Sequence, residues 1–175
     1  MACGKVVMFA LMLVGLVLTG CGLGARKDVA QETQDDMVCL KSASLKLIAA
    51  ALNRNTATME AAIKSGADVN VTVEGLGPPI VVTAVGDNYS GIQLLLDRGA
   101  NINAEDSDGY TALIIASLHN SLDILRLLLS KGVDVNKPSN LMVNGKKSGL
   151  TPLMIAKAKG HQEIVKLLTE AGAKK

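Results

Sequence analysis

The sequence predicts an all-α repeat solenoid, because one landmark recurs along the chain with a constant period. Gly66, Gly99 and Gly132 are spaced by 33 residues, and each opens a segment of the type Gly-Ala-Asp-Val-Asn; Gly172 follows after 33 plus 7 residues. An apolar helical stripe, such as residues 94–96 (Leu-Leu-Leu), precedes each glycine. Self-similarity at a period of about 20–50 residues is typical of stacked repeats.

The composition favours small interlocking helices. Apolar residues make up 49% of the chain but aromatic residues only 2%, so the core must consist of Leu, Ile, Val, Ala and Met. A β-sandwich is usually richer in aromatic and β-branched residues. The net charge of +2 is small, and few aromatic rings are available to stack on bases. Both features argue against a nucleic-acid partner.

Four helix pairs are expected, and each has local signals at its ends. We place the helices over residues 44–52 and 56–65, 79–87 and 90–98, 111–119 and 121–131, and 151–159 and 161–171. The hydroxyls of Thr111 and Thr151 can cap helices, and Pro152 suits a first helical turn. Small pairs such as Ala116-Ser117 allow the two helices of a pair to approach closely. Stacking of the pairs then completes the core.

Two sequence landmarks, which lie at different positions within each repeat, recur with the same spacing. Residues 108–113 (Asp-Gly-Tyr-Thr-Ala-Leu) and 148–153 (Ser-Gly-Leu-Thr-Pro-Leu) begin repeats that end in the Gly-Ala-Asp-Val-Asn segments. Over residues 40–175 this pattern resembles ankyrin repeats. The resemblance implies an ankyrin solenoid of about four helix-turn-helix repeats joined by β-hairpin loops. The family's histidine is replaced by Val81, Ile114 and Met154, so packing must replace its hydrogen bonds.

One hairpin is longer than the others. The seven extra residues lie between Asn136 and Thr151, and Lys146 and Lys147 make this loop basic. Lengthening a surface loop costs little free energy, and long loops often carry function.

Residues 1–20 have the features of a lipoprotein signal peptide. Lys5 gives a positive start, and residues 6–18 form an apolar run that is shorter than the ~20 residues needed to span a bilayer. Residues 18–21 (Leu-Thr-Gly-Cys) resemble the lipobox of bacterial lipoproteins, whose cysteine is acylated and becomes the mature N-terminus. An uncleaved anchor, or an ordinary signal with a chance cysteine, is the alternative.

The lipobox resemblance implies that Cys21 carries a lipid that tethers the protein to the membrane. Gly22 follows, rather than the Asp that often marks retention in the inner membrane, so we expect an outer-membrane lipoprotein that faces the periplasm. Residues 21–39 form the lipidated N-terminus and a linker without helical or strand periodicity. Cys39 then keeps the one free thiol, which is either buried or bridged to another molecule.

No set of residues has the spacing of a catalytic or metal site. His119 and His161 are the two histidines, and no acid lies at a helical spacing that would make either one a metal ligand. His161 stands where ankyrin repeats use a histidine structurally. Residues 106–109 (Asp-Ser-Asp-Gly) lack the later glycine and glutamate of a calcium loop, so we interpret them as a hairpin tip. We therefore expect no enzyme, no cofactor and no metal.

The ankyrin resemblance implies recognition of a protein through hairpin tips and exposed positions of the first helices. The corresponding residues are Glu74, Glu105, Ser107, Asp108, Tyr110, Leu118, His119, Lys146, Lys147, Leu150 and Lys159. Tyr110 is the expected anchor, because tyrosine contributes a large contact area at a low entropic cost. The hairpins change from acidic to basic along the chain, which would steer a partner into register.

We expect a protein that is monomeric when free and that binds and inhibits a partner protein. The most specific hypothesis is an immunity protein that neutralises an antibacterial toxin acting in the periplasm, such as a secreted lipase effector. The alternative is a scaffold or assembly factor for an envelope enzyme. The product of the adjacent gene would separate the two, because immunity genes lie beside their toxins.

Cys21→Ser tests the tether. It removes the sulfur that would carry the lipid, so we expect loss of palmitate labelling and an unprocessed or soluble product. Metabolic labelling followed by membrane fractionation measures both, and Cys39→Ser is the matched control. Unchanged labelling of Cys21→Ser would rule out the lipobox.

Overall fold

The structure is a computed structural model that describes residues 42–143 and 146–174. The expected signal peptide, Cys21, the linker and Cys39 lie outside the described residues. Within the described ranges, no helix has the length and hydropathy that are needed to cross a membrane.

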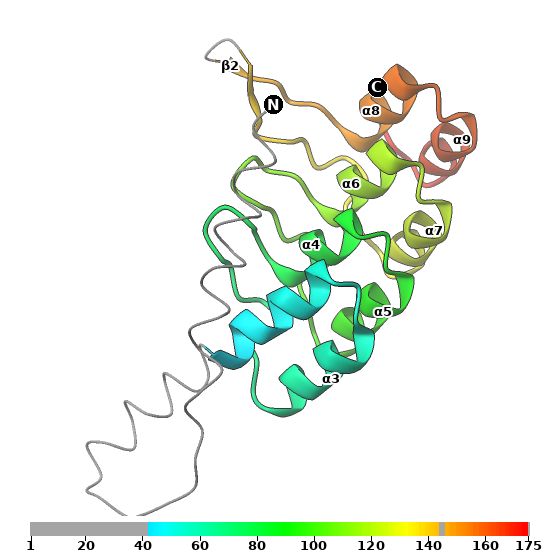
Figure 1. The fold of residues 1–175 in the computed structure, drawn as a ribbon. Helices are drawn as coiled ribbons and strands as arrows, with labels where there is room; N and C mark the ends of the chain where they lie inside the picture. The colour runs from blue at the N-terminus through cyan, green and yellow to red at the C-terminus, as the bar shows by residue number, and fades with distance from the viewer. Residues whose placement is uncertain (1–41, 144–145, 175) are drawn as a thin grey trace, which may run out of the picture.

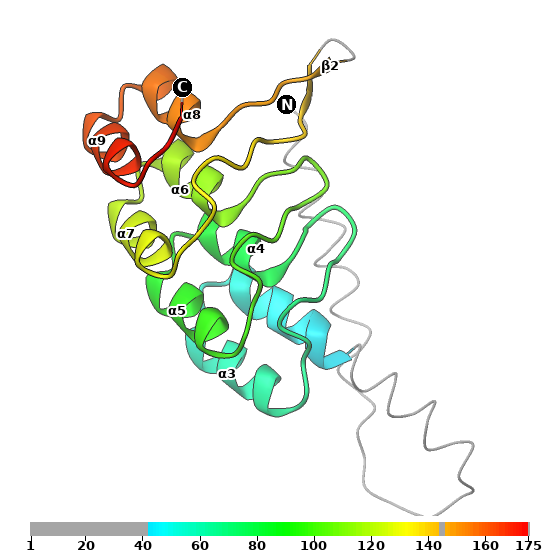
Figure 2. The ribbon, with the colours of Figure 1, turned by 180° about the vertical axis from the view of Figure 1, so that it is seen from behind.

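Eight helices of the described chain stack in two layers, which we call inner and outer (Figures 1 and 2). The inner layer contains the helix over residues 42–52, α4 (Pro79–Val85), α6 (Ala112–His119) and α8 (Pro152–Lys159). The outer layer contains α3 (Thr56–Lys64), α5 (Tyr89–Asp97), α7 (Leu122–Ser130) and α9 (Gln162–Glu170). Each helix ends within two residues of its expected bounds. The predicted all-α repeat solenoid is confirmed.

The helix starts follow the predicted caps. The Thr111 hydroxyl accepts a hydrogen bond from the amide of Ile114 at 3.3 Å, and Thr151 caps α8 in the same way. Two of the outer helices use asparagine: the side chains of Asn55 and Asn88 cap α3 and α5 at 3.0 Å. These bonds satisfy amides that would otherwise lack a partner in the first turn.

One left-handed residue separates the two helices of each pair. These residues are Arg54 (φ 56°), Asp87 (φ 52°), Asn120 (φ 62°) and Gly160 (φ 75°). Their spacings are 33, 33 and 40 residues, the same as those of the glycine landmarks. They therefore define equivalent positions in all four repeats.

A single apolar core runs through the stack. Its largest fully buried side chains are Leu47, Met59, Ile80, Ile92, Leu95, Leu113, Ile114, Ile124, Leu125, Leu128, Ile164 and Leu168. Ala84, Ser117 and Ala156 occupy equivalent or neighbouring small-residue positions and are also fully buried. The two helices of each of the last three repeats are in close contact, as the sequence predicts, and adjacent inner helices also pack closely.

Packing replaces the family's histidine in two of the three repeats. Val81 and Ile114 are 2% and 0% exposed, but Met154 is 42% exposed. The prediction is wrong for Met154, because within the described residues no further helix packs beyond α8. His161 has the expected structural role: its Nδ1 lies 2.9 Å from the carbonyl oxygen of Ser117 and links the last two repeats.

The asparagine that ends each landmark segment connects one repeat to the next. The side-chain oxygens of Asn70, Asn103 and Asn136 accept hydrogen bonds from the amides of Asn101 (2.7 Å), Asp134 (3.0 Å) and Lys174 (2.7 Å). These three residues form an inter-repeat ladder.

Leu128→Ala tests the stacked core. Leu128 is fully buried, so we expect a loss of about 2–5 kcal/mol in the free energy of unfolding. Leu52→Ala is the matched control, since Leu52 is 45% exposed and should change stability by no more than about 0.5 kcal/mol. Urea unfolding measures both, and equal losses would contradict the assigned packing.

Candidate functional site

Three hairpins join the repeats and project from the inner layer on the same side of the molecule (Figure 1). We call them finger 1 (residues 71–78), finger 2 (residues 104–110) and finger 3 (residues 137–150). Fingers 1 and 2 are closed by backbone bonds, from Gly77 to Val73 at 2.8 Å and from Asp106 to Tyr110 at 3.1 Å. The longer finger 3 contains strands β1 (Met142–Val143) and β2 (Lys146–Lys147), paired antiparallel.

Asp106 shapes the tip of finger 2. Its Oδ1 accepts hydrogen bonds from the amides of Asp108 at 3.0 Å and Tyr110 at 2.8 Å. Burial raises the pKa of the Asp106 carboxyl, and the two amide donors offset only part of this effect. The predicted hairpin tip is confirmed. Among the residues that the structure places, no three His, Cys, Asp or Glu side chains gather closely enough to hold a metal ion.

The fingers pack against one another. Gly77 of finger 1 lies so close to finger 2 that an added Cβ would be 2.7 Å from the Cβ of Asp106. A Cβ added at Gly109 of finger 2 would clash with the backbone nitrogen of Asn140 in finger 3. Both glycines have a positive φ, 78° and 75°. The fingers therefore form one continuous stack that only glycine permits at these two points.

Glu105 fastens finger 3 to finger 2. Its carboxylate lies 2.8 Å from the Lys137 ammonium and accepts a hydrogen bond from the Asn140 side chain at 3.2 Å. Lys137 also donates to the carbonyl oxygen of Asn103 at 2.8 Å. The side chains of Glu105 and Lys137 are only 28% and 29% exposed. Glu105 thus positions the long finger, in addition to any contact with a partner.

The other predicted finger residues differ in exposure. Glu74, Ser107 and Asp108 are exposed, whereas Leu150 and Tyr110 are half-buried. Tyr110 packs against the core, and burial raises the pKa of its hydroxyl. The side chains of Lys146 and Lys147 lie outside the described part of the structure.

The remaining predicted residues form a second group at the far end of the inner helices. Leu118 and His119 end α6, and Lys159 ends α8. An inner helix of eight residues is about 12 Å long. A partner must therefore cover roughly this length to contact both the fingers and this second group.

An apolar row crosses the inner layer at this second group. It consists of Leu52, Val85, Leu118 and Ala158, each two residues before a left-handed turn residue, and we call it the inner-face row. Leu52 is 45% and Val85 52% exposed, Leu118 is half-buried and Ala158 exposed. Because α4 and α6 have neighbours on both sides and outer helices behind them, this row lies on their one open face.

Sequence reasoning found only Leu118 of this row. Leu52, Val85 and Ala158 were not among the predicted residues, because residue type alone does not distinguish an exposed apolar side chain from a buried one. The spacing of 33, 33 and 40 residues between the four positions was the available signal.

Two family models match the chain, and together they cover residues 47–169. A family model described as ankyrin repeats (3 copies) matches residues 47–139. A second family model, ankyrin repeats (many copies), matches residues 115–169. No curated protein matches the chain.

Gly109→Ala tests the finger stack. Both Gly109 and Gly99 have a positive φ, but a Cβ at Gly99 would meet nothing within 4 Å. We expect Gly99→Ala to cost about 1–2 kcal/mol through backbone strain alone. Gly109→Ala should cost a further ~1–3 kcal/mol, because finger 3 must move away. Urea unfolding gives the difference, and equal costs for the two variants would contradict the stacking of fingers 2 and 3.

Proposed function

Because this chain belongs to the ankyrin-repeat family, whose repeats serve protein–protein interaction, we propose that it binds a partner protein across its fingers and inner-face row. The observation that carries this proposal is the largely exposed apolar row, which crosses the inner helices at the opposite end from the rigid finger stack. Exposed apolar side chains in a contiguous set mark interaction surfaces more often than single ones do. Fingers held by Glu105 and by close glycine contacts lose little entropy on binding.

The charges along the site favour a partner whose own charges are arranged in the complementary order. Glu74 and Asp108 are exposed acids on fingers 1 and 2, while Lys159 is an exposed base at the end of α8. Finger 3 adds two lysines in the sequence of β2. A partner whose charges run in the opposite order would associate faster and in one register.

We further propose that the protein is tethered to the bacterial envelope through a lipid on Cys21 and faces the periplasm, more specifically at the outer membrane. The support is the signal-like run of residues 6–18 followed by the Leu-Thr-Gly-Cys segment. The linker expected over residues 21–39 would let the repeat domain stand off a membrane surface.

We propose that binding inhibits the partner and does not serve its assembly. In the most specific version of this proposal, the chain is an immunity protein that neutralises a periplasm-acting toxin, such as a secreted lipase effector. A preorganised binding surface held at the membrane suits the capture of an enzyme that attacks that membrane. A scaffold or assembly factor for an envelope enzyme is the second candidate, favoured by the two separate groups of candidate residues on one face.

Coexpression with the adjacent gene product distinguishes the two roles. An immunity protein protects cells when the neighbouring product is directed to the periplasm, and Cys21→Ser should weaken this protection while leaving binding in solution unchanged. A neighbouring product that is harmless alone, but loses activity when this chain is deleted, would instead indicate the scaffold role.

Val85→Asp tests the inner-face row. It places a charge in the middle of the proposed interface, so we expect at least about thirtyfold weaker binding of the identified partner, equivalent to the loss of one hot-spot residue. Ala61→Asp on the outer helix α3 is the control, because Ala61 is also exposed and lies on the other layer. Calorimetric titration measures the affinities. Wild-type affinity of Val85→Asp would exclude this row from the interface.

A further inference from the structure

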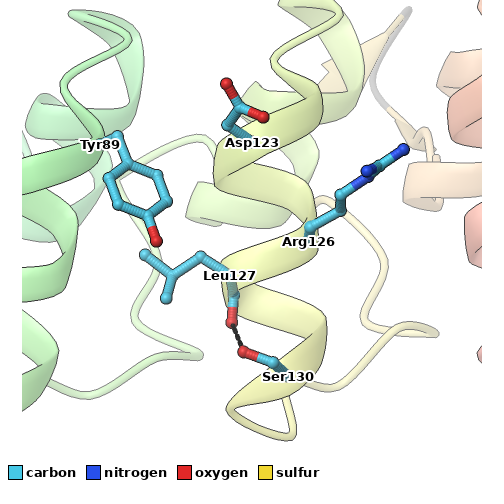
Figure 3. A pocket seen from close by; sticks show the side chains of 5 residues that line it. All are labelled: Tyr89, Asp123, Arg126, Leu127 and Ser130. Carbon is cyan, nitrogen blue, oxygen red and sulfur yellow. Dashed lines mark hydrogen bonds between the residues drawn. The ribbon is translucent and has the colours of Figure 1, made fainter.

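A pocket of about 450 Å³ lies on the outer layer, away from the fingers, where α5 and α7 face each other. It is lined by Tyr89, Asp123, Arg126, Leu127 and Ser130 (Figure 3). Tyr89 is 43% exposed, although tyrosine rings usually pack on a neighbour. Leu127 is 8% exposed and gives the pocket an apolar wall.

Two of the polar groups in this pocket are already engaged. The Ser130 hydroxyl donates to the carbonyl oxygen of Leu127 at 2.7 Å. Arg126 extends away from Tyr89 (Figure 3), and its guanidinium lies 3.4 Å from Glu163 on α9. The Tyr89 ring and the Asp123 carboxylate are therefore the groups that remain for a ligand.

Ion pairs link the outer helices of neighbouring repeats, and at the junction of α5 and α7 the pair is Asp97–Lys131. The pocket lies where a second pair, equivalent to Arg126–Glu163 at the next junction, is missing. Asp123 and Glu163 are equivalent positions, each three residues after a left-handed turn residue. The cation that pairs with Glu163 is Arg126, and its equivalent one repeat earlier is Gln93. Within the described part of the chain, the Asp123 carboxylate has no ion-pair or hydrogen-bond partner.

The residue at the start of the preceding outer helix also differs between the two junctions. Tyr89 is equivalent to Leu122, which is half-buried and packs against the core. The junction of α5 and α7 therefore combines an uncompensated carboxylate with an exposed aromatic ring. Guanidinium groups both pair with carboxylates and stack on aromatic rings, and they do so better than ammonium groups.

We propose that this pocket binds an arginine side chain of a partner polypeptide. The guanidinium pairs with the Asp123 carboxylate and stacks on the Tyr89 ring, and the aliphatic stem of the arginine packs on Leu127. The bound arginine supplies from outside the cation that Arg126 supplies within the chain at the next junction. This surface lies on the opposite layer from the inner-face row, so it is a second contact area that does not depend on the first.

Nuclear magnetic resonance with a small probe tests the pocket. The full chain, isotope-labelled and kept in solution with a non-ionic detergent, is titrated with N-acetyl-arginine methylamide. N-acetyl-citrulline methylamide, which has nearly the same shape without the charge, is titrated in parallel. We expect saturable shifts of the amides of Tyr89, Asp123 and Leu127 with the arginine probe and much smaller shifts with citrulline.

Amino-acid substitutions test whether Asp123 and Tyr89 bind the arginine probe. Asp123→Asn should remove most of the arginine-induced shift, and Tyr89→Leu, which copies the residue at position 122, should reduce it. Asp97→Asn is the matched control, because Asp97 is an acid of the same layer that already pairs with Lys131 at 3.3 Å. The proposal is overturned if citrulline gives equal shifts, if Asp123→Asn keeps them, or if arginine perturbs only the acidic fingers.

Discussion

The inner helices are short, and each leaves its apolar sides bare unless another repeat covers them. α4 has seven residues and α6 and α8 have eight, lengths at which an isolated helix is unstable in water. Their stability comes from the continuous core, in which Ile80, Leu113 and Leu153 occupy the same position in successive repeats and are almost fully buried. Repeat-to-repeat packing is therefore the interaction on which every other feature depends. It is reinforced by the ladder of Asn70, Asn103 and Asn136, whose side chains bind the amides of the next repeat.

This construction separates stability from recognition. The residues that face the neighbouring repeat are small or apolar, while the fingers and outer positions vary from one repeat to the next. Finger 3 holds the seven residues by which this repeat exceeds the 33-residue period, yet the helices around it keep their positions. The close contacts at Gly77 and Gly109, together with the Glu105–Lys137 ion pair, hold the fingers as one unit. A long loop that would otherwise be costly to order is thus prepared for binding before a partner arrives.

The two layers offer different chemistry. The inner layer presents an apolar row with acids and bases at its margins, which suits a broad protein interface. The outer layer is polar, and ion pairs such as Asp97–Lys131 and Arg126–Glu163 connect its neighbouring helices. Exposed pairs of this kind contribute at most about 1 kcal/mol each to stability. Their greater consequence is that an unpaired member, Asp123, becomes a specific feature of one junction, beside the only exposed aromatic ring of the described outer helices.

The repeat period, the eight helices of the described chain and the caps at Thr111 and Thr151 could be predicted from the residues alone, because they follow from local sterics and hydrogen bonding within a few residues. It also indicated the hairpin tip at residues 106–109 and the structural role of His161. Four features required the folded arrangement: Gly109 touches Asn140, Glu105 binds finger 3, Val85 is exposed while Val82 is buried, and Tyr89 and Asp123 share a pocket. Each of these depends on side chains that lie about one repeat apart along the chain. Their distances are set by how the repeats stack, and a pattern of residue types does not contain that geometry.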